Sequence, residues 1–191
     1  SCCGVSLMPS HRRSPAGVIA LKIQPVEVPM YDYQLMSLHS IAEIAQGQTP
    51  RIDGLTVEVG ALPPQPVAQR IVAALENGTL PEWCVSYMVI EKESRRVLAC
   101  CNFKGNPTDR SVEIGYGVSP LHWGKGVGVA AAMFLVDVAR KSALVDVVVA
   151  NISADNHASQ RVATKSGFVN TGQVIDCGGE KLVQWVLHIA V

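Results

Sequence analysis

The chain has 191 residues, and its 16 lysines and arginines balance its 16 aspartates and glutamates, so its formal net charge is zero. This balance lacks the basic excess typical of nucleic-acid binding, and we expect no nucleic-acid partner. Hydrophobic residues make up 48% of the sequence, which excludes a disordered chain and favours one domain with a substantial core.

The sequence also argues against a membrane or metal-binding protein. No apolar run approaches the length of a membrane-spanning helix, and no secretory leader is evident, so we expect no membrane partner. The cysteines include no C-x-x-C pair, which favours reduced thiols and a cytoplasmic location. None of the five histidines has the spacing of a metal site, and we therefore expect no metal: His11, His39, His122, His157 and His188.

The first third of the chain mixes strand-like and helical patterns. Residues 1–17 are expected to form an irregular, mobile N-terminal extension, and a single domain is expected over residues 18–191. The apolar run at residues 18–23 predicts a first strand. Apolar residues at helical spacing predict a helix over residues 31–46, which Gly47 would end. A short strand is expected at residues 55–59, and a second helix at residues 67–76 before Asn77 and Gly78.

The middle of the chain predicts three strands joined by short polar turns. These strands, at residues 83–91, 96–104 and 112–118, read as an antiparallel meander. A long helix follows from Val127, because its apolar residues change to a helical period.

The last third predicts a strand, a helix and a hairpin. The apolar run at residues 143–150 is typical of a strand buried on both faces. A helix is predicted at residues 156–166, ended by Gly167, before two strands at residues 168–175 and 182–189.

A glycine-rich turn connects the third strand of the meander to the long helix. Gly124, Gly126 and Gly128 alternate with other residues there, so the backbone can approach a ligand closely. The free N–H groups at the start of the helix would then favour a phosphate. The alternative is that the glycines only allow tight packing. A P-loop and a dinucleotide fingerprint both fit poorly, because their glycine spacings are absent.

These residues resemble a known family. Residues 123–128, Trp-Gly-Lys-Gly-Val-Gly, look like the acetyl-coenzyme A turn of the GNAT superfamily of N-acetyltransferases, usually written [Gln/Arg]-x-x-Gly-x-[Gly/Ala], with Trp123 in the place of Gln or Arg. The string at residues 113–120, together with Trp-Gly-Lys-Gly, looks most like the branch that contains the ribosomal-protein alanine N-acetyltransferases. The string at residues 150–168 looks like the Asn-x-x-Ser-x-Arg-Val-x-x-Lys-x-Gly-Phe segment of the superfamily. The resemblance implies an α/β (α+β) GNAT fold: a mixed, mostly antiparallel sheet of about seven strands with four flanking helices.

The resemblance also implies how acetyl-coenzyme A (acetyl-CoA) would be bound. The turn would hold the pyrophosphate through backbone N–H groups, and the N–H of Val118 would polarise the thioester carbonyl. Asn156 would contact the pantetheine arm, although it could instead serve only the first turn of its helix. Ser159 would contact the coenzyme or its sulfur; the alternative is a plain helix serine without a role. The cofactor-binding residues expected on this basis are Val118, Trp123, Gly124, Lys125, Gly126, Val127, Gly128, Asn156 and Ser159. Lys125 could equally be a solvated turn lysine.

Catalytic residues are implied at two positions. Glu113 matches the glutamate that family members often use as a general base, directly or through water; the alternative is a structural glutamate paired with a neighbouring strand. Many relatives carry a tyrosine, which protonates the leaving thiolate, seven residues after the position of Asn156. Here that position is Ala163, so the thiolate would leave unaided or take a proton from Ser159 or water.

The predicted function is therefore transfer of an acetyl group from acetyl-CoA to a primary amine by direct attack in a ternary complex. The alternative is a coenzyme A-binding module with lost or altered catalysis that acts as a sensor or scaffold; a nucleotide-dependent enzyme is a third, weaker reading. The acceptor would be a small molecule or a peptide N-terminus, and a homodimer is common in the family. Several acidic or aromatic residues between residues 31 and 78 suggest an acidic rim for a cationic amine: Tyr31, Asp32, Tyr33, Glu43, Asp53 and Glu58.

Overall fold

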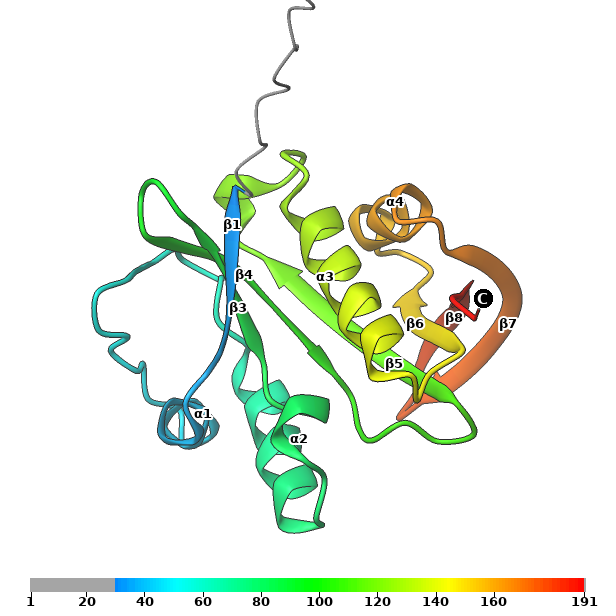
Figure 1. Ribbon diagram of the computed structural model, residues 1–191, viewed down its shortest axis with the longest axis horizontal. Coiled ribbons are helices and arrows are strands. Elements are labelled where there is room, and N and C mark those ends of the chain that lie inside the picture. Colours follow the sequence, from blue (N-terminus) through cyan, green and yellow to red (C-terminus); the bar gives the residue numbers. More distant parts are fainter. Residues whose placement is uncertain (1–29, 191) are drawn as a thin grey trace, which may run out of the picture.

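The structure is a computed structural model that describes residues 30–190. One mixed sheet runs through this part of the chain in the strand order β1-β3-β4-β5-β6-β8-β7 (Figure 1). The two-residue strand β2 pairs with β4. The strands are β1 (Tyr31–Leu35), β2 (Thr56–Val57), β3 (Tyr87–Glu91), β4 (Arg96–Phe103), β5 (Ser111–Val118), β6 (Val147–Ser153), β7 (Val169–Cys177) and β8 (Glu180–His188). The helices are α1 (Leu38–Ala45), α2 (Gln65–Glu76), α3 (Val127–Ser142) and α4 (His157–Lys165).

This architecture confirms the predicted fold class and the antiparallel meander of β3, β4 and β5. The sheet has eight strands rather than about seven, and the extra strand is the short β2. Only two neighbouring pairs are parallel, β2 with β4 and β5 with β6. The strand predicted at residues 18–23 and the extension at residues 1–17 lie outside the described residues.

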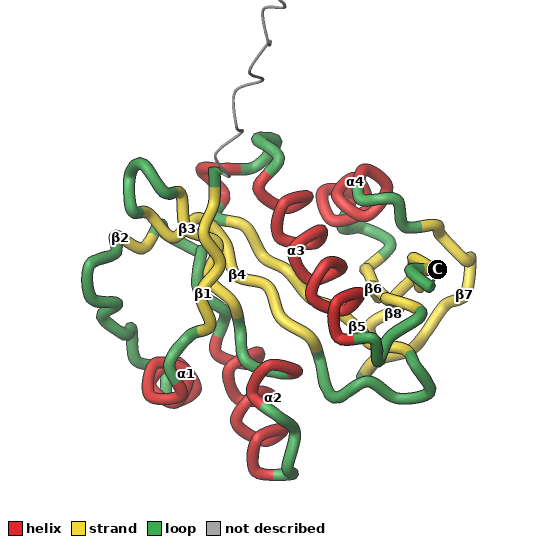
Figure 2. Tube along the Cα trace, viewed as in Figure 1, coloured by secondary structure: helices red, strands yellow, loops and turns green. Residues whose placement is uncertain are grey.

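The helix predicted over residues 31–46 is wrong in its first part. Residues 31–35 form β1, which pairs antiparallel with β3 (Figure 2), and α1 begins only at Leu38 with Ser37 as its N-cap. The apolar residues of this segment satisfy both periods, and the tertiary contacts decide between them. The ring of Tyr33 stacks on Phe134 of α3 at 4.0 Å between centroids, which requires its strand to lie in the sheet.

Two strand boundaries also differ from the prediction. Residues 81–83 form a 3-10 turn, so β3 begins four residues later than expected. Helix α3 extends to Ser142 and ends with Ala143 in the left-handed region, so β6 begins at Val147. Residues of β6 alternate between buried and half-buried, so it is not buried on both faces as predicted, and its half-buried face lines a cavity described below.

Two hydrophobic cores lie on opposite faces of the sheet. Helix α3 packs over β4 and β5 with α4 beside it, and this core contains Leu135, Phe103 and Ile114. Helices α1 and α2 form the other core with β3 and β4, around Ile41 and Ile90. Cys84, Cys100 and Cys101 are buried free thiols, as expected for small hydrophobic residues. Between residues 30 and 190, none of the helices has the length and apolar character needed to cross a membrane.

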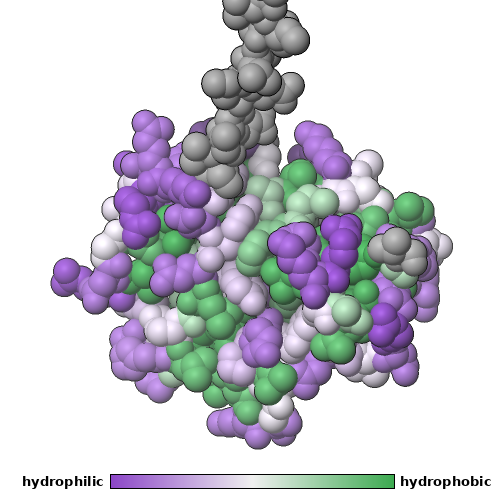
Figure 3. Space-filling view, viewed as in Figure 1, coloured by the Kyte–Doolittle hydropathy of each residue, from purple (hydrophilic) through white to green (hydrophobic). Residues whose placement is uncertain are grey.

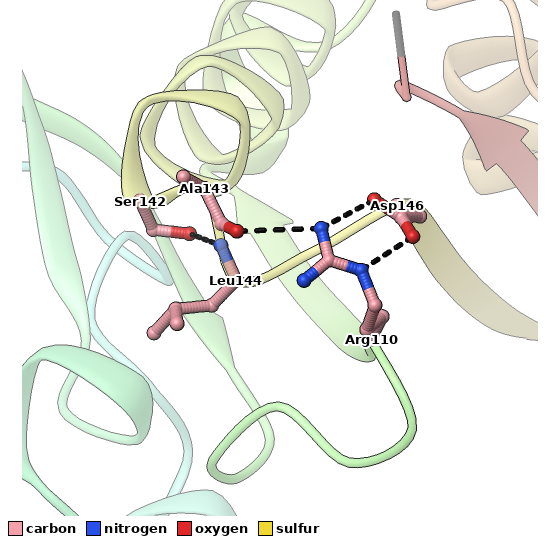
Figure 4. A network of polar contacts seen from close by, with 5 residues as sticks. All are labelled: Arg110, Ser142, Ala143, Leu144 and Asp146. Carbon is pink, nitrogen blue, oxygen red and sulfur yellow. Dashed lines mark hydrogen bonds and ion pairs between the residues drawn. The ribbon is translucent and has the colours of Figure 1, made fainter.

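The parallel contact between β5 and β6 is short and firmly anchored at one end. It comprises three residue pairs, from Ser111 with Val147 to Glu113 with Val149. Just before it, the carbonyl of Arg110 accepts hydrogen bonds from the backbone N–H groups of Asp146 and Val147. The guanidinium of Arg110 donates to both carboxylate oxygens of Asp146 at 2.5 and 2.7 Å, and to the carbonyl of Ala143 (Figure 4). This network fixes where β5 and β6 meet.

The Arg110–Asp146 pair makes a pH-dependent contribution to stability. Hydrogen bonding to Arg110 lowers the pKa of Asp146 below its ordinary value. The contribution of a carboxyl with a lowered pKa is present above its unfolded pKa of about 3.9 and is lost as the pH falls through its folded pKa. We expect Arg110→Met to be less stable than the wild type at pH 7, with the difference narrowing below about pH 4. Urea unfolding at pH 7, 5 and 3 measures this.

The matched control is Arg51→Met, which removes an ion pair with Asp53 whose side chains are 93% and 95% exposed. Such pairs contribute little to stability, so this variant should follow the wild type at every pH. A constant difference between Arg110→Met and the wild type from pH 7 to pH 3 would contradict the assignment.

Candidate active site

Strands β5 and β6 diverge after Glu113 and leave an opening between them. From Ile114 to Val118, β5 continues to pair with β4, whereas β6 continues along β8. The N–H of Lys104 donates to the carbonyl of Glu113, and the N–H of Ser119 donates to that of Leu98. Because antiparallel partners alternate between bonded and non-bonded pairs, the peptide groups of Tyr116 and Val118 lie on the edge that faces away from β4. This open edge is where Val118 was predicted to act.

The glycine-rich turn lies at the top of this opening and leads into α3. Gly124 and Gly126 have left-handed φ angles of 73° and 84°, which favour glycine, and a Cβ built on either would have no atom within 4 Å. Gly126 is the N-cap of α3, so the N–H groups of the first turn after it have no partner within the helix. Lys125 is exposed, and the side chain of Val127 is buried in the core, which leaves Val127 only its backbone N–H for a ligand.

Gly128 serves packing, which was the alternative reading of the three glycines. A Cβ at this position would lie 2.8 Å from Cγ2 of Val162, at the contact between α3 and α4. Gly128 is buried, so it lets α4 approach the start of α3 closely. Gly128 therefore positions α4 against α3, whereas Gly124 and Gly126 shape the turn.

Trp123 folds back onto the open edge of β5. Its indole Nε1 donates to the carbonyl oxygen of Val118 at 2.9 Å, while 62% of the residue remains exposed. The hydrogen bond satisfies an acceptor that no strand reaches. Sequence reasoning placed Trp123 in the turn but did not predict this contact. The feature of the sequence that could have predicted it is an aromatic hydrogen-bond donor five residues after the end of a strand.

The first turn of α4 faces the opening from the other side. Asn156 is its N-cap, and Oδ1 of Asn156 accepts from the N–H of Ser159 at 3.0 Å. Asn156 thus serves the first turn of its helix, which was the alternative to a role in cofactor binding. The amide NH₂ of Asn156 takes no part in this capping hydrogen bond. The carbonyl of Ser159 accepts a hydrogen bond from the hydroxyl of Tyr116 at 2.9 Å. Ala163, one turn later, is buried.

Tyr116 is a site residue that sequence reasoning missed. It comes from β5 and joins that strand to α4 across the opening. Burial raises the pKa of Tyr116 to about 12, so the hydroxyl remains a hydrogen-bond donor at neutral pH. Its aromatic ring between two glycines of a strand was the signal that could have identified it.

Glu113 lies on the opposite face of the sheet from α3. Its neighbours Val112 and Ile114 are buried in the α3 core, so strand alternation directs Glu113 to the other face. There its Oε1 lies 2.5 Å from Nζ of Lys104, the residue that follows the end of β4. Pairing with a neighbouring strand was the alternative predicted for Glu113. Both side chains are about one-third exposed, so the pair remains accessible.

The Lys104–Glu113 pair lines a cavity of about 330 Å³ at the point where β5 and β6 part. The cavity also receives Val149 and Asn151 from the half-buried face of β6 and Gln184 from β8. Its remaining lining comes from the β4–β5 turn and the start of β5: Gly105, Asn106, Thr108, Ser111 and Val112.

The acidic rim suggested between residues 31 and 78 does not present free carboxylates. Each of the four carboxylates lies within 4 Å of a cationic or titratable nitrogen, in the pairs Asp32–Lys92, Glu43–His39, Asp53–Arg51 and Glu58–Arg96. Tyr33 donates to the carbonyl of Ala130 on α3. On the face drawn in Figure 3, hydrophilic and hydrophobic residues are interspersed rather than segregated.

Two histidines that flank the motifs stay outside the predicted site. His122 is 3.9 Å from Glu58, and His157 is exposed at the start of α4. Within residues 30–190 there is no group of three or more side chains that could ligate a metal ion.

The structure thus combines an opening between β5 and β6 with a glycine turn at the start of α3. A profile of the acetyltransferase (GNAT) domain matches residues 41–169. The chain therefore belongs to the GNAT acetyltransferase family and is an acetyl-CoA-dependent acyltransferase. The family and the cofactor predicted from the sequence are confirmed.

Several known proteins are similar to the chain. The uncharacterized N-acetyltransferase YjdG of Bacillus subtilis (strain 168) is 27% identical over 154 residues, which cover 78% of this chain and 86% of that protein. The ribosomal-protein-S5-alanine acetyltransferase from Vibrio fischeri shares the fold with a TM-score of 0.55 and 16% identity, over 85% of this chain and 94% of that one. An aminoglycoside acetyltransferase, AAC(6')-Ib in complex with coenzyme A, has a TM-score of 0.59 and 16% identity, over 83% and 94%.

The contact between Gly128 and Val162 can be tested by a double-mutant cycle. Over-packing costs about 1–3 kcal/mol, whereas alanine gains up to about 1 kcal/mol over glycine in a helix. We expect Gly128→Ala to lower the free energy of unfolding by about 1 kcal/mol, because Val162 is stiff and cannot move aside. Val162→Ala, which is destabilising alone, should relieve the clash in the double variant. Additive effects in urea unfolding would show that α3 and α4 do not meet here.

Proposed function

We propose that this protein is an N-acetyltransferase that transfers the acetyl group of acetyl-CoA to a primary amine by direct attack in a ternary complex. The observation that carries the proposal is the opening between β5 and β6, which begins after Glu113 and extends to the end of β5, where the chain leads into the glycine turn. A cofactor and an acceptor could therefore reach the same point from opposite faces of the sheet.

The residues around the turn fit the cofactor. Gly124 and Gly126 leave an uncrowded, left-handed cradle beside the unpaired N–H groups of α3, which suits a pyrophosphate. The open edge at Tyr116 and Val118 offers backbone groups to an extended pantetheine arm, and the amide NH₂ of Asn156 would add a donor. Lys125 would contribute positive charge from the exposed turn. When bound, acetyl-CoA supplies the acetyl group already activated as a thioester.

The protein's own groups would then assist three events of the transfer. The N–H of Val118 would donate to the carbonyl oxygen as negative charge develops on it. Glu113 would accept the proton that the amine releases, directly or through a water molecule. The hydroxyl of Ser159 would donate a hydrogen bond to the departing thiolate, which would leave as the anion or take its proton from water, since Ala163 has no proton to give.

A second function is favoured by two observations. Glu113 is neutralised by Lys104, and Ala163 stands where many relatives carry a tyrosine. Both would suit a coenzyme A-binding module without catalysis, acting as a sensor or scaffold. The two functions differ in turnover and agree in cofactor binding.

Calorimetric titration with acetyl-CoA, with ATP and NAD as controls, tests cofactor binding. We expect micromolar affinity for acetyl-CoA alone, and thiol release when amines are added. Removal of a general base typically costs about 10²–10⁴-fold in rate, so Glu113→Gln should lose turnover on that scale while its dissociation constant for acetyl-CoA stays unchanged.

The matched control is Glu93→Gln, in the exposed turn between β3 and β4, which should keep full activity. Undiminished turnover in Glu113→Gln would exclude Glu113 as the base. Binding of acetyl-CoA without turnover of any amine would favour the sensor or scaffold.

A further inference from the structure

We infer that the acceptor is a small primary amine that carries a carboxylate close to its amino group, as an α-amino acid does. This inference rests on the proposed acetyltransferase function and names its acceptor class. It comes from the charges, the floor and an unpaired polar atom of the Glu113 cavity, taken in turn below.

The charges in the cavity come as one adjacent pair. Lys104 and Glu113 are its charged lining residues in the described part of the chain, and their Nζ and Oε1 atoms are 2.5 Å apart. An amine that carries only positive charge would approach Glu113 while Lys104 repels it, and would leave Lys104 without its partner. A zwitterion avoids both costs, because its carboxylate takes over Lys104 while its amino group faces Glu113. Charges of alternating sign then lie side by side.

The spacing of the pair limits how far apart the two groups of the acceptor can lie. Because Lys104 and Glu113 are in direct contact, one or two carbon atoms between amine and carboxylate suffice to reach both. A Cβ built on Gly115 would lie 3.3 Å from Cε of Lys104 and 3.5 Å from Oδ1 of Asn102, so the side chain of Lys104 lies over Gly115. A Cβ at Gly117 would meet nothing within 4 Å. The uncovered part of the floor on this face of β5 is therefore at Gly117.

Asn151 supplies a further point of recognition. Its Oδ1 is buried and has no hydrogen-bond partner within residues 30–190, although Asn151 lines the cavity. A buried acceptor without a donor is costly, so rotation of the Asn151 amide toward a ligand N–H group in the cavity would gain affinity. The amino group of the acceptor has such N–H groups. Gln184, directly across from Asn151 on β8, adds a second amide to the same wall.

The charges of the cavity lining argue against a polycationic acceptor, because Glu113 is the one carboxylate among the described residues that line it. A polyamine or an aminoglycoside would need several free carboxylates. A zwitterion needs one cation and one anion, which the cavity provides.

The experiment compares matched acceptors with the full chain and acetyl-CoA, following thiol release. Each of the common L-amino acids is tested beside its amide and its decarboxylated amine, with spermidine and an alanine-initiated peptide as further arms. An amino amide is less basic than the amino acid, so a preference for the acid does not reflect easier deprotonation. We expect at least one amino acid to have a kcat/KM ten-fold or more above both of its neutral-headed analogues.

Lys104→Met should raise KM for that amino acid ten-fold or more and leave KM for its amide unchanged, whereas Lys104→Arg should retain most of the preference. Lys141→Met, on the exposed side of α3, is the matched control and should change neither. Calorimetric binding of acetyl-CoA verifies that each variant is folded.

Turnover of amides, spermidine or the peptide at rates equal to or above those of the amino acids would overturn the inference and leave the acetyltransferase function intact. Equal effects of Lys104→Met on acid and amide would also overturn it. Acetyl-CoA binding without turnover of any acceptor would instead overturn the proposed function, and this inference with it.

Discussion

The site depends on the limited length over which β5 can pair with β6. A strand has two hydrogen-bonding edges, and β5 keeps β4 on one of them along Ile114–Val118 while its other edge loses β6 after Glu113. Buried backbone groups must find partners, so an open edge inside a fold is costly unless something outside the sheet satisfies it. Trp123 satisfies one carbonyl of this edge. The remaining groups define the shape and polarity that an extended ligand must match.

Strand alternation places neighbouring residues of β5 on opposite faces of the sheet. The face beside the glycine turn and the face that carries Glu113 are therefore separated by a single residue. Val112 and Ile114 point into the α3 core and support the wall beside the glycine turn, whereas Glu113 points into the cavity on the other face. Gly115 and Gly117 follow Glu113 on that face; the side chain of Lys104 lies over Gly115, whereas a Cβ at Gly117 would meet nothing within 4 Å. The pattern Glu-x-Gly-x-Gly therefore places a carboxylate beside a stretch of strand that has no side chains of its own.

The sequence could predict what depends on local patterns. The meander, the glycine turn, α3 and α4 all have clear periods and stop signals, and each was found within a few residues. The segment at residues 31–35 was missed because its choice between helix and strand depends on Phe134, which lies about one hundred positions later. Contacts such as Lys104 with Glu113, Tyr116 with Ser159 and Trp123 with Val118 join elements whose side-chain geometry no spacing rule specifies. The roles of Glu113 and Asn156 stayed open for the same reason.

The anchor at Arg110 has a mechanical consequence. Three residue pairs and the Arg110 guanidinium hold β5 and β6 together at one end. The pair of strands β6 and β8 can therefore rotate as a unit relative to β5 about this end. A small rotation of this kind hardly changes distances near Glu113. It moves β6 away from β5 by an amount that increases along the strands toward Val118 and Ser153. Sequence changes in the C-terminal hairpin would therefore alter the width of the opening between β5 and β6 far more than the geometry beside Glu113. The opening and the Glu113 cavity can thus evolve at different rates.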